Sequence, residues 1–303
     1  MTKNQEFYGQ FLNWLSIGHT SATVSSYQWG LKIFIDWLDG TEKELLELKE
    51  KDFVDYCHYL KNDRRVKNST AASYFCSVRT MWRWLYRQKM VLFSDDLIPV
   101  PKADDREHYP FLTECELELI LGSFDEFYPK DLRDKTIFAF LFATGLRLGE
   151  LLDIDAADID LDRQKATVKT EKRKNHYREV YWDDSTNELL KKWEVVRKKI
   201  LARHGINQGA LFINMSTHGF GQRAERFMIQ KLFRRKRKEL GIKKQITPHT
   251  CRHGFGHKAV KMDVHPRMLQ KMLGHAKLNT TMIYMGVEDI EVEKVYRAKM
   301  AMA

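Results

Sequence analysis

Apolar residues recur at helical spacing through the N-terminal third of the chain. One face of the helix expected at residues 20–38 carries Tyr27, Leu31, Phe34, Ile35 and Leu38. Similar patterns, rich in aromatic residues, occupy 4–15, 42–61 and 68–88. Aromatic side chains at this spacing are more typical of a core than of ligand stacking. The pattern therefore predicts a domain of four helices.

The periodicity stops at residues 94–110, SDDLIPVPKADDREHYP, which hold three of the six prolines. Proline cannot donate a backbone hydrogen bond and interrupts regular elements. We therefore predict a linker at 94–110 between a helical domain at 1–93 and a second domain at 111–303. Thr113 and Glu116 have the spacing of a capping box, which would start the first helix of the second domain.

The second domain mixes helical and strand patterns. Residues 164–172 and 177–184 flank a polar turn and predict a β-hairpin. The segments expected to be helical are 135–146, 147–155, 248–261, 266–275 and a charged terminal segment at 287–303. The expected fold class is mainly α with a small β-hairpin sheet.

Composition narrows the class of protein. The chain has 303 residues, 43% hydrophobic and 30% charged, and contains no apolar run long enough to span a membrane. Its N-terminus lacks a secretory pattern, so we expect a cytoplasmic protein with no membrane partner. Four scattered cysteines form no CxxC pair, and we expect buried, reduced thiols at Cys57, Cys76, Cys115 and Cys251.

Positive charge is concentrated in one segment. The net charge is +10, and residues 222–244 alone contain ten Lys or Arg against two Glu. We expect this basic run to form a helix that contacts phosphates through Arg234, Arg235 and Lys238. The residues expected to anchor it are Phe227, Leu232, Phe233 and Leu240. The alternative is a solvated basic face.

Two of the N-terminal helices begin with clusters of Ser and Thr. Backbone N–H groups and hydroxyls at such ends suit phosphate, which makes Ser69 and Thr70 candidate contacts. Helix capping alone explains the clusters equally well.

The stretch ITPHTCRHGFGH places three imidazoles and a guanidinium within about two helical turns. His249, Arg252, His253 and His257 would lie beside one another on a helix that begins with Thr247 as its cap and Pro248 in its first turn. A metal site, an anion clamp and a merely polar helix all fit. An HxxxH spacing without a catalytic Glu is a poor zinc motif.

Two other stretches bear on this choice. ATGLRLGELLDID places Arg147 after a Thr-Gly turn with Glu150 one turn later, and MLGHAKLNTTMIYMGV contains His275 and Tyr284. In this order, with His249–His253 between them, these segments resemble the tyrosine recombinase (phage integrase) family, in particular its small Xer-like members. Cys251 stands where the family usually has Leu, and we expect it to be buried without effect on the chemistry.

The resemblance implies a chemistry for these residues. Tyr284 would attack a DNA phosphodiester, release the 5′ oxygen and form a 3′-phosphotyrosyl link. Arg147 and Arg252 would bind the non-bridging oxygens, because guanidiniums match phosphate bidentately. His249 and His275 would serve as base and hydrogen-bonding partners, and Glu150 and His253 would orient the site. No metal, cofactor or ATP is required, and His257 is expected to be structural.

The leaving 5′ oxygen needs an acid, which in the resembled family is a Lys on a β-hairpin turn. This hairpin offers Lys169, Lys172 and Lys174. Arg178 matches the Arg that opens the returning strand in the family, and the spacing from it favours Lys172. Lys174 remains the alternative acid and a candidate DNA contact.

The resemblance also implies partners. A core-binding (SAM-like) domain and a catalytic domain would clamp duplex DNA, and a homo-tetramer would assemble on two paired sites. A paralogous recombinase could supply some of the subunits. The helix at 287–303 would dock in a neighbouring subunit or pack on its own domain.

Two alternatives stay open. A type IB topoisomerase would use the same chemistry to relax DNA as a monomer, and a catalytically idle factor would only bind DNA. Because the first helix starts almost at residue 1, no arm-binding domain is expected before it, which favours an Xer-like recombinase over a lambda-type integrase. The target site, and a role in phage integration, chromosome-dimer resolution or transposon mobility, stay open.

Overall fold

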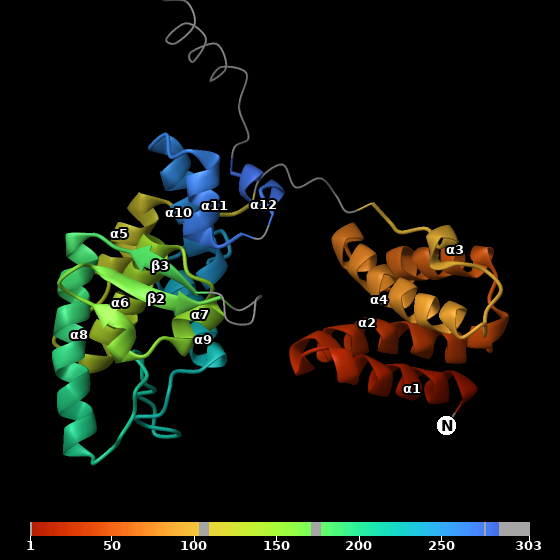
Figure 1. Cartoon of the computed structure of the whole chain (residues 1–303), viewed down its shortest axis with the longest axis horizontal. Coiled ribbons are helices and arrows are strands. Elements are labelled where there is room, and N and C mark those ends of the chain that lie inside the picture. The colour runs from red at the N-terminus through yellow and green to blue at the C-terminus, as the bar shows by residue number, and fades with distance from the viewer. Residues whose placement is uncertain (1, 103–108, 171–176, 276, 285–303) are drawn as a thin grey trace, which may run out of the picture. The chain divides into compact units, whose positions relative to one another are not determined.

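The computed structural model describes residues 2–102, 109–170, 177–275 and 277–284. The chain divides into two compact units, Met1–Glu107 and His108–Ala303 (Figure 1). Each unit has its own hydrophobic core. The prediction of a mainly α protein with a small sheet is confirmed.

The N-terminal unit is helical throughout its regular structure. Its elements are α1 (Lys3–Gly18), α2 (Ser21–Gly40), η1 (Leu45–Glu47), α3 (Glu50–His58), η2 (Tyr59–Asp63), α4 (Asn68–Arg87) and η3 (Asp95–Leu97). Helix α2 packs between α1 and α4. The stripe predicted on α2 is buried at Leu31, Phe34, Ile35 and Leu38, as the spacing required.

The single helix predicted at 42–61 is wrong. The chain instead makes the short turn η1 and starts α3 only at Glu50. Two side-chain contacts explain the break. The Asn4 side chain on α1 accepts a hydrogen bond from the Leu45 backbone N–H at 2.8 Å, and the Asp52 carboxylate accepts one from the Lys49 N–H at 2.7 Å. The second contact caps the start of α3.

The first residues of the predicted linker pack on the N-terminal unit. Ile98 lies in its core, and Arg83 on α4 forms an ion pair with Asp95 at 2.6 Å. The indole N–H of Trp82 donates to the Phe93 carbonyl at 2.9 Å. Residues 93–98 are thereby fixed against α4.

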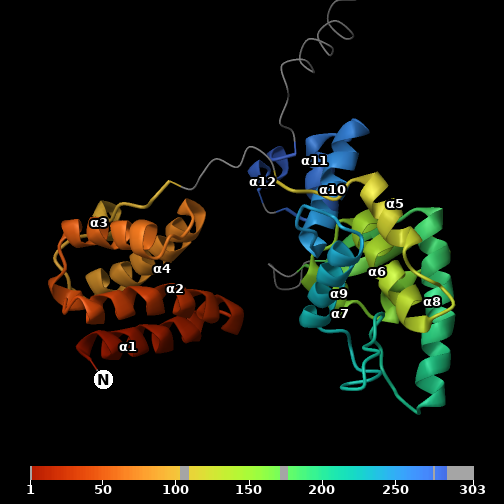
Figure 2. The same ribbon diagram turned by 180° about the vertical axis from the view of Figure 1, so that it is seen from behind.

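The C-terminal unit is built around one helix. Its helices are α5 (Glu114–Gly122), α6 (Pro129–Thr144), α7 (Leu148–Asp153), η4 (Ala156–Asp158), α8 (Asp184–Arg203), α9 (Arg226–Glu239), α10 (Pro248–Lys261), α11 (Pro266–Leu273) and α12 (Asn279–Met282). The central helix, α6, contacts α5, α8, α10 and the sheet. The sheet covers one side of α6 (Figure 1), and α5 and α10 lie on the other (Figure 2).

The sheet contains the predicted hairpin and one further strand. Strands β1 (Ile159–Asp160), β2 (Lys165–Lys169) and β3 (Tyr177–Tyr181) are antiparallel in the order β1-β2-β3. Val168 pairs with Arg178, so Arg178 lies near the start of the returning strand, as predicted. The Thr113–Glu116 capping box is also confirmed, since the Glu116 carboxylate accepts from the Thr113 N–H at 2.9 Å.

The prediction of four buried thiols holds only for Cys251. Cys251 is fully buried on α10, while Cys57 is half-buried and Cys76 and Cys115 are exposed; all four are free. Cys76 is exposed because its neighbours Phe75 and Val78 take the inward positions on α4. Within the described ranges, no helix is both long and apolar enough to cross a membrane.

Candidate active site

The histidine-rich stretch forms the first turns of α10, as predicted. The Thr247 hydroxyl caps the helix by accepting a hydrogen bond from the Thr250 N–H at 3.3 Å, and Pro248 occupies the first turn. On this helix Arg252 and His253 face inward, and both are buried. His249 lies one turn before them, with its ring 4.3 Å from that of His253.

Arg252 is held by two carbonyls from separate elements. Its Nη1 donates to Gly145 O at 2.7 Å and its Nη2 to Leu273 O at 2.6 Å. Gly145 ends α6 in the left-handed region, with φ 61°, which favours glycine. Burial, reinforced by the nearby charge of Arg147, lowers the pKa of Arg252 to about 9. The guanidinium is therefore still charged at neutral pH.

Arg147 caps the start of α7 together with Glu150. The Glu150 carboxylate accepts from the Arg147 backbone N–H at 2.9 Å and from its Nη1 at 2.8 Å. The Nη2 of Arg147 donates to Gly274 O at 3.2 Å. Glu150 is fully buried, whereas the Arg147 side chain keeps 18% of its surface exposed. Arg147 can thus meet a ligand while Glu150 fixes its orientation.

Tyr284 lies against the histidine face of α10. Its hydroxyl is 3.0 Å from His253 Nδ1, and its ring lies so close to Gly256 that an added Cβ would be 2.8–2.9 Å from ring atoms. Burial raises the pKa of the phenol, and the charges of Arg252 and Arg147 oppose this shift. The structure therefore brings together the predicted tyrosine and both predicted arginines.

The imidazoles around Tyr284 are neutral in this environment. The ring of His275 stacks on that of Tyr284 at 6.3 Å and 12°, and its Nδ1 is 2.9 Å from the Thr281 hydroxyl. Burial is the main cause that lowers the pKa of His275 to about 3 and that of His253 to about 4. It also lowers the pKa of His249. A neutral imidazole can accept a proton from a phenol.

The segment at the start of the C-terminal unit packs on the same face of α10. The Tyr109 ring is 5.4 Å from His253, and the Phe111 ring stacks on His257 at 3.8 Å. The Leu112 N–H donates to Thr250 O at 2.9 Å. His257, expected to be structural, thus stacks on Phe111 and meets the Tyr284 ring edge-on at 5.7 Å.

Arg178 was not among the site residues predicted from the sequence. Its Nη2 donates to Glu150 at 2.9 Å, and its Nε donates to Met272 O at 3.1 Å. Arg178 is thus the third guanidinium of the cluster. The two favoured lysines, Lys172 and Lys174, lie outside the described residues, and Lys169 is exposed at the end of β2.

The basic run forms α9, but only part of it is free to meet a ligand. Leu232 and Phe233 are buried as predicted, whereas Phe227 is 64% exposed, so its predicted anchoring role is wrong. The helix spans only Arg226–Glu239 of the predicted run at 222–244, which leaves Phe227 in its first turn and off the core face.

The charged residues of α9 differ in their contacts. Arg235 pairs with the buried Asp134 at 3.1 Å, and Lys236 is buried with its ammonium 4.0 Å from the centre of the Phe124 ring. Arg234 and Lys238 are exposed. In the N-terminal unit, Ser69 and Thr70 are half-buried in the first turn of α4, and no side-chain cap comes from Lys67.

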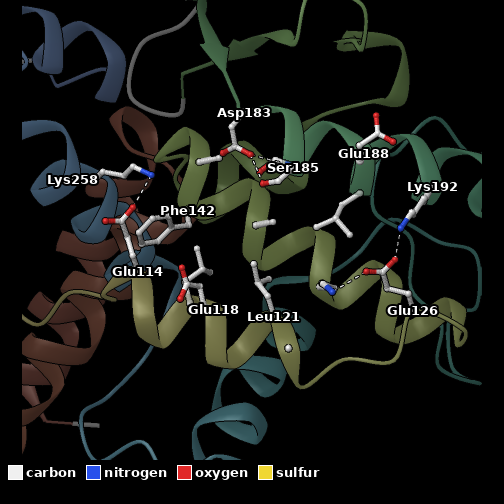
Figure 3. Close-up of a pocket in the computed structure, with 17 residues that line it drawn as sticks. Glu114, Glu118, Leu121, Glu126, Phe142, Asp183, Ser185, Glu188, Lys192 and Lys258 are labelled. Atoms are coloured by element: carbon white, nitrogen blue, oxygen red, sulfur yellow. Dashed lines mark hydrogen bonds and ion pairs between the residues drawn. The ribbon is translucent and has the colours of Figure 1, made fainter. Parts of the chain in front are cut away.

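A cavity of about 520 Å³ lies elsewhere, between α5, α6 and α8 (Figure 3). Two of its lining carboxylates form ion pairs, Glu114 with Lys258 at 2.8 Å and Glu126 with Lys192 at 2.6 Å. None of the residues predicted for the site lines it. Across the described ranges, no three His, Cys, Asp or Glu side chains are grouped to hold a metal.

Comparison with known proteins agrees with this arrangement. Residues 110–290 match the phage integrase family, and residues 10–91 match the N-terminal SAM-like domain of phage integrases. The chain therefore belongs to the phage integrase family, the tyrosine recombinases. The tyrosine recombinase XerD of Listeria monocytogenes is 28% identical over 293 residues, which cover 95% of this chain and 96% of XerD.

Solved structures share the fold. The Tn1549 transposon integrase in complex with a circular intermediate DNA aligns with a TM-score of 0.75 and 15% identity, covering 99% of this chain and 100% of the integrase. The XerH site-specific recombinase bound to its palindromic difH substrate aligns with a TM-score of 0.73 and 19% identity, covering 93% of this chain and 80% of XerH.

Proposed function

We propose that this chain is a site-specific DNA recombinase that cleaves and rejoins duplex DNA through a 3′-phosphotyrosyl intermediate on Tyr284. The observation that carries the proposal is the position of the Tyr284 hydroxyl, 3.0 Å from a neutral imidazole and within the field of Arg147 and Arg252. A buried phenol among cations and a proton acceptor is suited to nucleophilic attack on an anionic phosphate.

The arginines supply the electrostatic part of the mechanism. The scissile phosphate gains negative charge on its non-bridging oxygens as it becomes pentacoordinate. Arg147 and Arg252 are held in place by fixed carbonyls and Glu150, so little reorganisation is needed when that charge develops. Each guanidinium carries five N–H donors, so both retain donors for phosphate beyond the hydrogen bonds they already make.

Proton transfer completes the step. The Tyr284 oxygen attacks phosphorus and loses its proton to an imidazole. His253 is in contact with the hydroxyl, His275 stacks on the Tyr284 ring, and His249 contacts His253. The P–O5′ bond breaks, and the 5′ oxygen takes a proton from the hairpin lysine, Lys172 or Lys174. Attack by a 5′ hydroxyl on the phosphotyrosine reverses both transfers and rejoins a strand without ATP.

The proposed partner is duplex DNA, clamped by the two units. The XerH and Tn1549 integrase structures contain DNA, which supports this partner. The exposed Arg234 and Lys238 on α9, with Ser69 and Thr70 on α4, are the proposed phosphate contacts. Strand exchange would take place in a tetramer on two paired sites, made of this chain alone or with a paralogous recombinase.

A trapping experiment tests the proposal. Duplexes with a randomised central sequence and a nick are incubated with the protein, and covalent adducts are recovered by denaturing electrophoresis and sequenced. We expect a defined site to be enriched by the wild type and no adduct from Tyr284→Phe. Relaxation of supercoiled plasmids that lack any enriched site would instead indicate a topoisomerase. Binding without an adduct would indicate an idle DNA-binding factor.

A further inference from the structure

Three arginines donate hydrogen bonds to three successive carbonyls at the carboxyl end of α11. Met272 O accepts from Arg178 Nε at 3.1 Å, Leu273 O from Arg252 Nη2 at 2.6 Å, and Gly274 O from Arg147 Nη2 at 3.2 Å. The last carbonyls of a helix lack intrahelical donors and carry the negative end of its dipole. This helix end is therefore a common frame for all three arginines.

Arg178 also shares a carboxylate with Arg147. Its Nη2 donates to Glu150 Oε2 at 2.9 Å, the oxygen that also accepts from the Arg147 backbone N–H. The other oxygen, Oε1, accepts from the Arg147 guanidinium at 2.8 Å. Because Glu150 is fully buried and held from both sides, a change at Arg178 would pass through the carboxylate to Arg147.

The site is built to accommodate Arg178. Its side chain is only 7% exposed, and a Cβ at Gly274 would lie 3.1 Å from its Cδ and Nε. Gly274 also has a φ of 63°, in the left-handed region that favours glycine. A glycine at this position therefore permits both the backbone turn and the close approach of Arg178. Burial lowers the pKa of Arg178, with a smaller contribution from Arg147 in the same direction.

The cluster has more positive charge than its own residues neutralise. Three guanidiniums face one carboxylate, which gives a formal net charge of +2. The Arg178 Nη1 is buried without a hydrogen-bond partner among the described residues. An unpaired buried donor is unfavourable, more so on a cation.

By contrast, the buried Arg197 on α8 donates hydrogen bonds to two backbone carbonyls, Ala210 O and Gln208 O, away from this cluster.

We propose that Arg178 is a positioning residue of the cleavage site. It holds Glu150, and through Glu150 the phosphate-binding Arg147, against the carboxyl end of α11, and it ties strand β3 of the hairpin to the same frame. This inference rests on the proposed strand cleavage at Tyr284.

The experiment compares cleavage of two substrates. The probes are nicked duplexes of the enriched site, one with an ordinary scissile phosphate and one with a neutral methylphosphonate. The measured quantity is the rate of adduct formation at saturating DNA, normalised to the folded fraction. We expect Arg178→Met to slow cleavage of the phosphodiester about 10²-fold, with DNA affinity unchanged. The defect should shrink on the methylphosphonate, because Arg147 then has less charge to stabilise.

Two further variants complete the design. Arg197→Met removes a buried arginine outside the site, and we expect it to lower the melting temperature without changing the normalised rate on either substrate. Arg178→Lys keeps the positive charge but loses the planar guanidinium that donates to both Glu150 and Met272 O. It should therefore show the pattern of Arg178→Met to a smaller degree, and it replaces the Met variant if that variant does not fold. Equal defects of Arg178 variants on both substrates, or wild-type rates, would overturn the inference. If the wild type forms no adduct with any DNA, the proposed function itself fails.

Discussion

Two imidazoles of the site, the buried His253 and the half-buried His275, have pKa values well below that of an exposed histidine. Burial lowers the pKa of His275 to about 3 and that of His253 to about 4. In the unfolded chain both titrate near pH 6.5. Below that pH the unfolded chain takes up protons that the folded chain does not. The contribution of these two imidazoles to stability is therefore fully present above pH 6.5 and is lost as the pH falls.

This linkage predicts a pH-dependent stability. We expect the free energy of unfolding in urea to decrease between about pH 7 and about pH 5, a range above the titration of ordinary carboxylates. His275→Gln keeps a polar group beside Thr281 but cannot be protonated, so its stability should depend less steeply on pH. Parallel curves for the wild type and His275→Gln would show that this imidazole is not held neutral.

A single glycine tests the position of the nucleophile. A methyl group at residue 256 would lie 2.8–2.9 Å from the Tyr284 ring. We expect Gly256→Ala to displace Tyr284 and slow adduct formation about 10²-fold while DNA binding is retained. Gly122→Ala at the end of α5 is the control, because nothing lies within 4 Å of its added Cβ. Equal cleavage rates for both variants would mean that Tyr284 acts from another position.

At the scale of elements, the hairpin carries the proposed general acid. Lys172 would protonate the leaving 5′ oxygen, so Lys172→Ala should slow cleavage roughly 10²–10⁴-fold. A bridging 5′-phosphorothiolate releases a thiolate that needs little protonation and should restore the rate of this variant. Arg147→Ala should not be restored, because its proposed contacts are the non-bridging oxygens. Rescue of Lys174→Ala, with normal cleavage by Lys172→Ala, would assign the acid to Lys174.

Helix α9 offers a second test at this scale. Arg234 and Lys238 are exposed, whereas Arg235 is paired with the buried Asp134. We expect Arg234→Gln with Lys238→Gln to reduce the slope of log affinity against log salt by about 2, since each phosphate contact contributes about 0.9. Neutralising Lys198 and Lys199 on α8 removes the same charge elsewhere and should leave the slope unchanged. An unchanged slope in the α9 variant would place this helix away from DNA.

The sequence predicted the elements whose stabilising contacts are local. The stripe on α2, the hairpin and the start of α10 follow from spacing, capping residues and a first-turn proline, all read within a few positions. The break in residues 42–61 did not follow, because it depends on Asn4, which lies 41 positions before Leu45. Likewise, the partners of Arg178 are Glu150 and Met272, 28 and 94 positions away, so no local pattern signals its place.

At the scale of the whole molecule, distant segments converge on one small site. The end of α6, the start of α7, strand β3, the first turns of α10 and the carboxyl end of α11 each contribute a contact to the arginine cluster. Segment 109–112 packs against α10, with Tyr109 beside His253. The sequence motifs predicted the residues proposed to react, and the fold adds the groups that hold them.

The measurement that tests the central claim most directly is the chemical identity of the protein–DNA bond. The adduct formed with a nicked duplex is digested with protease and nuclease, and the modified peptide is sequenced by mass spectrometry. The account predicts one nucleotide attached through its 3′ phosphate to the oxygen of Tyr284. Attachment to any other residue, or through a 5′ phosphate, would contradict it.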